Sequence, residues 1–517
     1  MTNNAETSPS TNWNPEVLEN KVFMLFPFTF DAHSLLDDAA CKKLQELVHS
    51  FRIIESNEFQ KNTIDLFPNP YTPNETRLWR DLTGDATQDF FPFVRQIAGV
   101  PKVDDNINQQ LFTHPIQVAE DALFSKNKGG KPRIFKAALK PAAAERCGNT
   151  KVHLQLAAPT IYGFASGTAI LVMEWSYKAL PTKKLCALDV LEGNYALCER
   201  HPKKLSTQED AHEELNSQRL MEICRALLPS SIANQIVLER RFIYTGLRIA
   251  PELEESQKNV YTLASRLSKR ETTAYEPATD NDLRGMISPF KNILHMAAIE
   301  GGCTMIQADN SAPEFLRNLI KDRIRNTYLP LALVSIHAHH WLLRMTQILP
   351  DSAQTKDAET EQRSLENLKT RLLHFQRTFH FPIASQISQH NDFHDLWQEK
   401  LQIDRQLQWQ IELSTTLAAK VQETRMRWVG LISGIAGSFL VTRELFAAVI
   451  DKLTMNSFEW QQNLLTALLN GKTVDLKLTQ TLHEAVSTAN FLEWVAIGAP
   501  TLVAVIAGYI IYRIEFR

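Results

Sequence analysis

WVAIGAPTLVAVIAGYIIY, residues 494–512, is a run without a single charged side chain. As an α-helix it would extend about 28 Å, close to the hydrocarbon thickness of a bilayer. Trp494, Tyr509 and Tyr512 lie near its two ends, where such rings prefer the lipid headgroups, and Arg513 ends the run. The stretch therefore predicts a membrane-spanning helix, and the rest of the chain is interpreted around it.

A second apolar segment lies upstream, at residues 428–450. Its first part, WVGLISGIAGSFLVT, is uncharged, and Arg443 and Glu444 interrupt it before LFAAVI completes the segment. The whole segment would extend about 35 Å as a helix, which would put the charged pair in its outer part. Alone, the first part also fits a buried helix of a globular protein. Together the two segments predict a hairpin of two spans, joined by an extracytoplasmic loop at residues 451–493.

Basic residues determine the orientation that we expect for this hairpin. Lys420, Arg425 and Arg427 precede the first span, and Arg513 follows the second. Because basic residues flank membrane spans on the cytoplasmic side, both chain termini are expected in the cytoplasm, including a tail at residues 513–517.

Composition limits the classes of protein to which the chain can belong. The net charge is −3 over 517 residues, so no basic excess is present to neutralise phosphates, and direct nucleic-acid binding is not expected. The six cysteines form no CxxC pair, which fits a reducing cytosol better than a zinc ribbon or a disulfide framework. Residues 1–20 are polar and lack an apolar signal sequence, which predicts a short disordered arm.

Residues 21–300 mix strand and helix patterns. KVFMLFPFTF, GTAILVMEWSYK and RFIYTGLRIA are β-branched or aromatic runs, whereas QEDAHEELNSQRLMEICRALL has apolar residues at helical spacing. Only Ala165 and Ser166 separate TIYGF from GTAILVMEW, which predicts a β-hairpin. The fold class we expect is an α+β cytosolic sensor domain with a mixed, largely antiparallel sheet.

Residues 301–427 are expected to form a helical stalk domain, because no glycine occurs between Gly302 and Gly430. We expect helices around residues 314–348 and 355–379, then a last helix that begins near Asp392 and continues unbroken into the first span. One apolar stripe follows that last helix, formed by Ile403, Leu407, Ile411, Ala418 and Val421.

This order of parts resembles the CorA family of divalent-cation channels. That family ends its first span with a Gly-Met-Asn turn, and Thr454, Met455 and Asn456 stand at the corresponding place here. Threonine departs from the motif because a β-branched residue resists the positive φ that glycine permits, and the loop at residues 451–493 is longer than the family's connection. The resemblance covers residues 313–517 best.

The resemblance implies a homo-oligomer, pentameric in this family, in a bacterial inner membrane, with no cofactor beyond a divalent cation in the pore. One branch that resembles CorA serves as the membrane effector of bacterial antiphage systems, including type III CRISPR loci, where a small nucleotide-type second messenger binds the cytosolic domain. The altered entrance motif fits this branch. The implied function is a ligand-gated channel or effector. The alternatives are a divalent metal cation transporter for Mg²⁺, Co²⁺ or Zn²⁺, and a membrane-anchored binding or scaffold protein.

Small and polar residues recur along the first span at a spacing of four. This spacing fits close packing between helices and also a narrow polar pore. A glutamate that faces the pore would attract cations, although pairing with the neighbouring arginine is an equally good interpretation. The candidate pore-lining or helix-packing residues are Gly430, Ser433, Gly434, Gly437, Ser438 and Glu444, and the candidate entrance residues are Thr454, Met455 and Asn456.

Two basic groups occur in the cytosolic domain. Lys126, Lys128, Lys131 and Arg133 surround two glycines, an arrangement that fits either a phosphate-binding loop or a solvated surface loop. The pair Arg240-Arg241 is similarly ambiguous, since one arginine of such a pair can simply support a strand edge.

Histidines cluster at residues 337–340 and 390–394. We interpret them as structural or solvated, because no third ligand of suitable spacing accompanies them, and no metal site is predicted. The chain also lacks a nucleophile elbow, a Walker motif, an HExxH motif and a dinucleotide-binding fingerprint, which argues against an enzyme.

Overall fold

The computed structural model describes residues 13–30, 79–81, 113–118 and 134–419, the last range with gaps, and isolated helical residues between 422 and 466. The chain forms two compact units. The first comprises Met1–Leu349 and Glu366–Ser414, and the second comprises Pro350–Leu365 and Thr415–Arg517. The β-sheet and both hydrophobic cores described below belong to the first unit.

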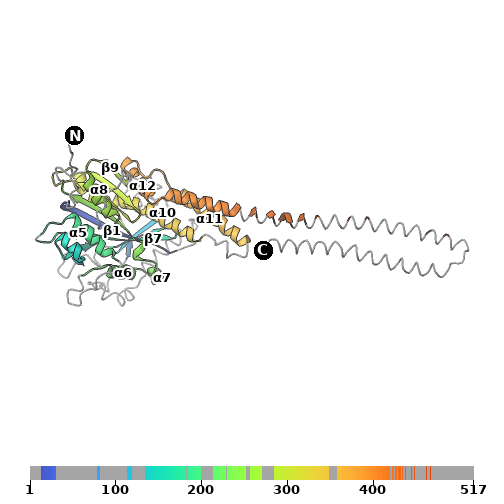
Figure 1. The fold of residues 1–517 in the computed structure, drawn as a ribbon, viewed down its shortest axis with the longest axis horizontal. Helices are drawn as coiled ribbons and strands as arrows, with labels where there is room; N and C mark the ends of the chain where they lie inside the picture. The colour runs from blue at the N-terminus through green and yellow to red at the C-terminus, as the bar shows by residue number, and fades with distance from the viewer. Residues whose placement is uncertain are drawn as a thin grey trace, which may run out of the picture. The chain divides into compact units, whose positions relative to one another are not determined.

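A mixed eleven-stranded sheet forms the centre of the first unit (Figure 1). Its main path runs β2-β3-β6-β7-β1-β8-β11-β10-β9, while β5 pairs with β4 and β7. Among the described strands, β8 and β11 pair in parallel and the other pairs are antiparallel. The strands are β1 (Val17–Thr29), β2 (Trp79–Asp81), β3 (Thr113–Val118), β4 (Phe135–Ala138), β5 (Lys151–Leu156), β6 (Thr160–Phe164), β7 (Thr168–Lys178), β8 (Phe242–Ile249), β9 (Met286–Phe290), β10 (Ile293–Ala298) and β11 (Gly301–Gln307).

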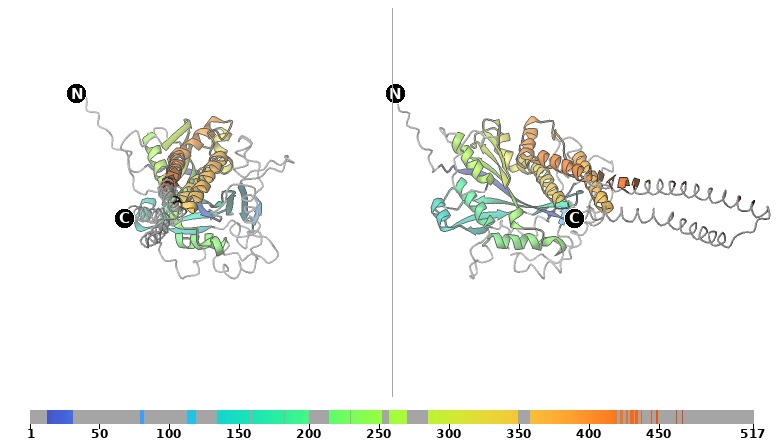
Figure 2. Two further views of the ribbon diagram at one scale, coloured as in Figure 1. Left: turned by 90° about the vertical axis from the view of Figure 1, so that its right-hand side faces the viewer. Right: turned by 45° about the vertical axis from the view of Figure 1, so that its right-hand side comes forward.

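Helices cover both faces of the sheet, and each face has its own hydrophobic core. Figures 1 and 2 show α6 (green) and α10 (yellow) on opposite sides of the strands. The first core contains α4 (Pro141–Cys147), α5 (Ala187–Cys198), α6 (Ser217–Ala226), α7 (Ser230–Ala233) and α8 (Gln257–Lys269), with η2 (Leu238–Arg240) packed beside it. The second core contains α9 (Glu314–Asn318), the π-helix η4 (Leu319–Tyr328), α10 (Leu329–Ile348), α11 (Ala358–Phe379) and α12 (Ser388–Lys400).

Strand β1 separates the two cores because it pairs on both sides, with β7 and with β8. Successive side chains of β1 point to opposite faces of the sheet. Val22, Met24 and Phe26 therefore lie in the first core, and Phe23 and Leu25 lie in the second. A strand that is buried on both faces has apolar residues at consecutive positions, and this part of the sequence shows that pattern.

The hairpin expected at Ala165-Ser166 is present between β6 and β7. The two strands pair from Thr160↔Val172 to Phe164↔Thr168. Gly167 has φ +82° and donates its amide to the Phe164 carbonyl at 3.0 Å. Glycine adopts this left-handed conformation without steric cost, so the turn is encoded locally.

The arm expected over residues 1–20 ends earlier than the composition indicates. Strand β1 begins at Val17, and its polar residues are paired: Glu19 lies opposite Arg248, and Asn20 opposite Leu247. Asn20 is buried despite its polarity. The composition of this segment indicates disorder, but partner strands satisfy its polar groups.

The boundary expected between residues 300 and 301 is also corrected. It falls between β10 and β11, which pair with each other, and β11 pairs in addition with β8. The helices expected to form a separate stalk domain, at residues 314–348 and 355–379, instead contribute to the second core on the sheet, the latter through its residues from 366 onward. A glycine-free composition signals helices correctly, but it does not say where they pack.

The unbroken helix expected from Asp392 is interrupted. Helix α12 ends at Lys400, and helical structure resumes at residue 403. The Leu401 amide donates to the Trp397 carbonyl and the Gln402 amide to the Glu399 carbonyl, both at 3.0 Å, while Gln402 has φ +52°. These are the bonds of a helix C-terminus, formed here without glycine or proline.

No helix among the described residues is long and apolar enough to cross a bilayer. Spans are expected at residues 428–450 and 494–512. Most of the first segment and all of the second lie outside the described residues.

Candidate ligand-binding cavity

A cavity of about 580 Å³ lies between α10 and one end of the sheet. We call it the arginine–histidine cavity. Four segments contribute to it: β1, the η2–β8 junction, the β10–β11 turn and the C-terminal half of α10. Its lining residues are Pro27, Glu239, Arg240, Arg241, Phe242, Ile299, Glu300, His339, His340, Leu343, Arg344, Thr346 and Gln347.

The cavity wall from α10 follows from helical spacing. Residues three and four apart on a helix lie on one face, so His340, Arg344 and Gln347 point to the same side. Opposite this wall, Gly301 allows the β10–β11 turn to approach β8, since an added Cβ would stand 2.0 Å from the Ile243 carbonyl oxygen. The Ile243 amide donates a hydrogen bond to the Glu300 carbonyl of this turn at 3.2 Å.

Two arginines of the cavity, Arg240 and Arg344, form no ion pair with a carboxylate of the described part of the chain. Arg240 is exposed, and it has no ion-pair partner in the described part of the chain. Arg344 is half-buried, and its Nε atom is buried without a hydrogen-bond partner among the described residues. A buried N–H group without an acceptor is energetically unfavourable, so Arg344 is suited to receive an acceptor from a ligand.

The histidines of the cavity are held neutral. Burial, together with the charges of Arg240 and Arg344, lowers the pKa of His340 to about 4. Its Nε2 atom lies 3.3 Å from Thr29 Oγ1. Burial likewise lowers the pKa of His339. At neutral pH both rings therefore act as hydrogen-bonding groups and add no charge.

Arg241 has a different role from its neighbour. Its guanidinium donates to the carbonyl of Leu238 and, at 2.6 Å, to the carbonyl of Cys198. It therefore anchors the start of β8 to the end of α5. Of the two alternatives for the arginine pair, support of a strand edge describes Arg241, and an open cationic surface describes Arg240.

The cavity combines a modest positive charge with an apolar surface. Three arginines face two carboxylates, those of Glu239 and Glu300, which leaves one net positive charge. Phe242, Ile299 and Leu343 provide the apolar part, and the last two are among the exposed large hydrophobic residues. Such a mixture fits an organic anion that carries an aromatic or apolar group.

Hydrogen bonds join the wall of the cavity to the helical residues 403–414. Gln406 Nε2 lies 3.1 Å from His339 Nδ1. The buried Gln410 donates its amide to the Leu342 carbonyl at 2.7 Å and to Thr346 Oγ1 at 2.9 Å. A ligand that moves α10 would therefore act directly on this helix.

The structure describes only some of the site residues expected from the sequence. Gly430, Ser433, Gly434, Gly437 and Glu444 are helical and exposed, and a Cβ added at the three glycines would meet nothing within 4 Å. The remaining predicted site residues lie outside the described residues, namely Lys126, Lys128, Lys131, Arg133, Ser438, Thr454, Met455 and Asn456.

The other clustered histidines are buried in the second core. His337 Nε2 lies 2.5 Å from Ser166 Oγ, and its ring stacks on Phe164. His390 Nδ1 lies 3.1 Å from Ser385 Oγ, and His394 stacks on Phe381. No group of three or more metal-ligating side chains is found in the part of the chain that the structure describes.

The sequence analysis did not single out Arg344, and it interpreted His339 and His340 as structural or solvated. The spacing of His340 and Arg344 on one helical face was visible in the sequence. Their proximity to Arg240 was not, because it depends on how α10 packs against the start of β8.

Comparison with known proteins adds little to this description. No family model matches the chain, and no curated protein matches it. Among solved structures it is similar to the structure of the full-length CmaX protein, with 11% sequence identity over 49% of this chain and 88% of that chain, and a TM-score of 0.14. A likeness at this TM-score carries no argument about fold or function.

Proposed function

We propose that this protein is an oligomeric, CorA-like channel or effector of the bacterial inner membrane, opened by a nucleotide-type second messenger that binds the arginine–histidine cavity. In this proposal it acts in antiviral defence through ion leak. One observation carries the proposal: Gln406 and Gln410, on the helix that precedes the first apolar segment, bond to residues of the cavity wall.

The ligand class follows from the lining of the cavity. Phosphate oxygens are acceptors that suit the fork of a guanidinium, and both Arg240 and Arg344 are open to them. A nucleobase needs an apolar surface, which Phe242 and Leu343 offer. The buried Nε of Arg344 would obtain its missing acceptor from the same ligand.

The gating step follows from differential affinity. A ligand shifts a closed-to-open equilibrium only by binding one state more tightly than the other. Here the difference would arise at α10, because a bound phosphate that repositions Arg344 also moves the helical turns that carry His339 and Thr346. Their bonds to Gln406 and Gln410 would then favour a different position of the helix at residues 403–414.

The proposal is tested with full-length protein in liposomes, by recording ion flux while linear and cyclic adenine and guanine nucleotides are added one at a time. We expect at least one nucleotide to evoke flux and Arg344→Gln to raise the concentration required about 10- to 100-fold, because a charge-assisted hydrogen bond is lost. Arg317→Gln removes an exposed arginine of α9 outside the cavity and should leave the response unchanged.

Two results would replace the proposal with the alternatives. Divalent-cation flux that needs no nucleotide would identify a transporter. Membrane association without flux under any condition would indicate a binding or scaffold protein, in which the hairpin is an anchor.

A further inference from the structure

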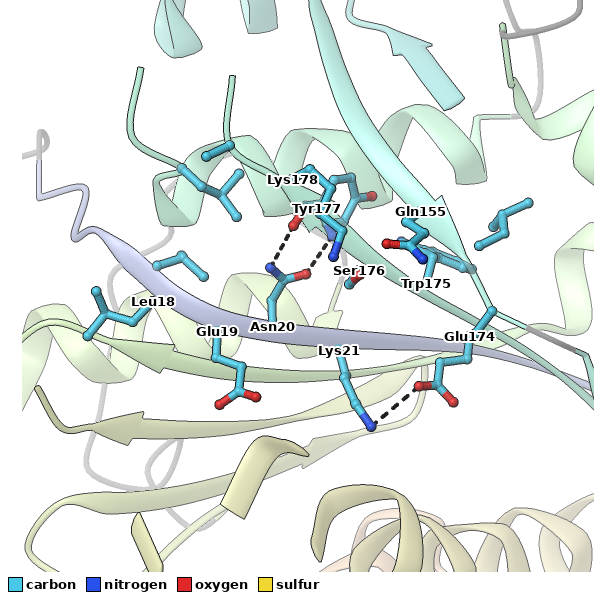
Figure 3. A pocket seen from close by; sticks show the side chains of 15 residues that line it. Leu18, Glu19, Asn20, Lys21, Gln155, Glu174, Trp175, Ser176, Tyr177 and Lys178 are labelled. Atoms are coloured by element: carbon cyan, nitrogen blue, oxygen red, sulfur yellow. Dashed lines mark hydrogen bonds and ion pairs between the residues drawn. The ribbon is translucent and has the colours of Figure 1, made fainter. Parts of the chain in front are cut away.

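A second cavity, of about 500 Å³, lies where β1 and β7 diverge (Figure 3). We call it the strand-divergence cavity. The two strands pair from Thr29↔Thr168 to Val22↔Trp175 and no further. Beyond that point the side chain of Asn20 replaces the backbone ladder: its amide donates to the Tyr177 carbonyl at 3.0 Å, and it accepts from the Tyr177 amide at 2.6 Å. The cavity therefore lies between two strands whose separation is set by the hydrogen bonds between Asn20 and Tyr177.

Hydrogen-bond donors line one side of this cavity. Gln155 of β5 lies directly opposite Ser176 of β7, and Lys178 follows two residues later on the same face. Within the described part of the chain, none of these three side chains has a hydrogen-bond or ion-pair partner. Burial alone lowers the pKa of Lys178, with no carboxylate acting on it. This side offers an ammonium, an amide and a hydroxyl to an incoming anion.

Two carboxylates also line the cavity. Glu174 is already neutralised, since Lys21 Nζ lies 3.5 Å and Arg325 Nε 3.4 Å from its oxygens. Arg248 Nε lies 3.6 Å from a Glu19 oxygen, and Lys21 and Lys321 also favour the charged form of Glu19. Burial outweighs these cations and raises the pKa of Glu19. A cationic group in the cavity would therefore stabilise the Glu19 carboxylate.

The ammonium of Lys178 and the half-buried carboxylate of Glu19 both line the cavity, and neither one perturbs the pKa of the other. A ligand with two charged ends can therefore reach both groups from inside the cavity. The lining contains two lysines and two glutamates and has no net charge. A phosphate group, with two negative charges, would meet only one unpaired ammonium and two carboxylates, so this arrangement disfavours it.

We infer that the strand-divergence cavity binds a small zwitterion of the α-amino-acid class. The ligand carboxylate accepts hydrogen bonds from Lys178, Gln155 and Ser176, and the ligand ammonium pairs with Glu19. Both contacts are charge-assisted hydrogen bonds, which are stronger than neutral ones. The inference does not depend on the proposed function, because the arginine–histidine cavity shares no lining residue with this one.

The test is calorimetric titration of the full-length protein in detergent with the standard α-amino acids, one at a time. We expect at least one to bind. Its carboxamide derivative, which lacks the carboxylate, should bind about 10-fold more weakly or worse, as expected for losing hydrogen bonds between charged groups. Lys178→Met should weaken the amino acid to the same degree and leave the weak binding of the carboxamide unchanged.

Lys369→Met, which removes an exposed lysine of α11, is the matched control and should bind as wild type. Thermal unfolding of each variant identifies any that fail to fold, and Lys178→Gln then serves as a second variant. Lack of binding by every amino acid at millimolar concentration would overturn the inference. So would equal affinity of wild type and Lys178→Met for the amino acid and its carboxamide.

Discussion

His295, His337, His390 and His394 are buried in the first unit, and each is at most 1% exposed. Each makes a hydrogen bond through one ring nitrogen, to Thr304, Ser166, Ser385 and Gln398 respectively. Aromatic rings surround them, as at His295, whose ring lies 4.7 Å from that of Tyr328. A neutral imidazole fits this environment, and a charged one would lack solvation.

These histidines make stability depend on pH. Burial lowers the pKa of His295 to about 3 and that of His394 to about 4, from an ordinary value of 6.5. The unfolded chain therefore takes up protons at a higher pH than the folded chain. The stabilising effect is complete above about pH 6.5 and is lost progressively as the pH falls toward 4.

We expect the midpoint of thermal unfolding to fall steadily between pH 7 and pH 5, in a buffer series at constant ionic strength. His394→Gln removes one of the titrating groups, and its midpoint should fall less steeply with decreasing pH, whatever its value at pH 7. An equally steep decrease in this variant would show that other groups control the acid sensitivity.

At the scale of elements, aromatic contacts join α10 to α11. The rings of Trp341 and Phe375 stack with a centroid distance of 4.0 Å and an angle of 4° between their planes. Both side chains are almost fully buried. Two helices that are separated in the chain by residues 349–357 are thus held together by an extended flat contact.

Trp341→Ala is expected to lower the free energy of unfolding by about 3–5 kcal/mol, because it removes a large buried ring and leaves a cavity. Trp409→Ala is the matched control, since Trp409 is 49% exposed, and it should cost less than about 1 kcal/mol. Both values come from denaturant unfolding monitored by circular dichroism. Similar losses for the two variants would contradict the assigned packing.

The break between α12 and the helical residues 403–419 is also a property of elements. A non-glycine residue in the left-handed conformation costs about 1 kcal/mol, so the local sequence opposes the conformation of Gln402. Burial of Leu401 and Ile403 on either side of it, each no more than 1% exposed, offsets that cost. Contacts with the rest of the protein therefore overrule local preference at this point.

At the scale of the whole molecule, the proposed coupling runs from the arginine–histidine cavity through Gln410 to the C-terminal segments. Gln410→Leu should leave nucleotide affinity within about 2-fold, because Gln410 does not line the cavity, but it should reduce nucleotide-evoked ion flux about 10-fold by removing two hydrogen bonds. Calorimetry and liposome flux measure the two quantities separately.

Gln408→Leu provides the control for this prediction, since Gln408 is exposed on the same helix. It should retain both binding and flux. Normal flux in Gln410→Leu would exclude this route of coupling, while the binding of nucleotide in the cavity would remain a separate question.

The sequence by itself determined the features that depend on neighbouring residues. The continuous apolar run of β1 and the turn at Gly167 follow from local patterns, and the structure contains both. Helices at residues 314–348 and 358–379 likewise follow from a composition without glycine. The two apolar segments near the C-terminus predict membrane spans for the same reason, because length and hydrophobicity are local quantities.

Only the tertiary structure decided where these elements meet. Arg240 and Arg344 share a cavity because α10 packs beside the start of β8, and Lys178 and Glu19 line another cavity because β1 and β7 diverge. The interruption at Gln402 and the inclusion of β11 in the sheet have the same origin. Each depends on contacts between residues far apart in the chain, which the spacing of residues within a segment does not encode.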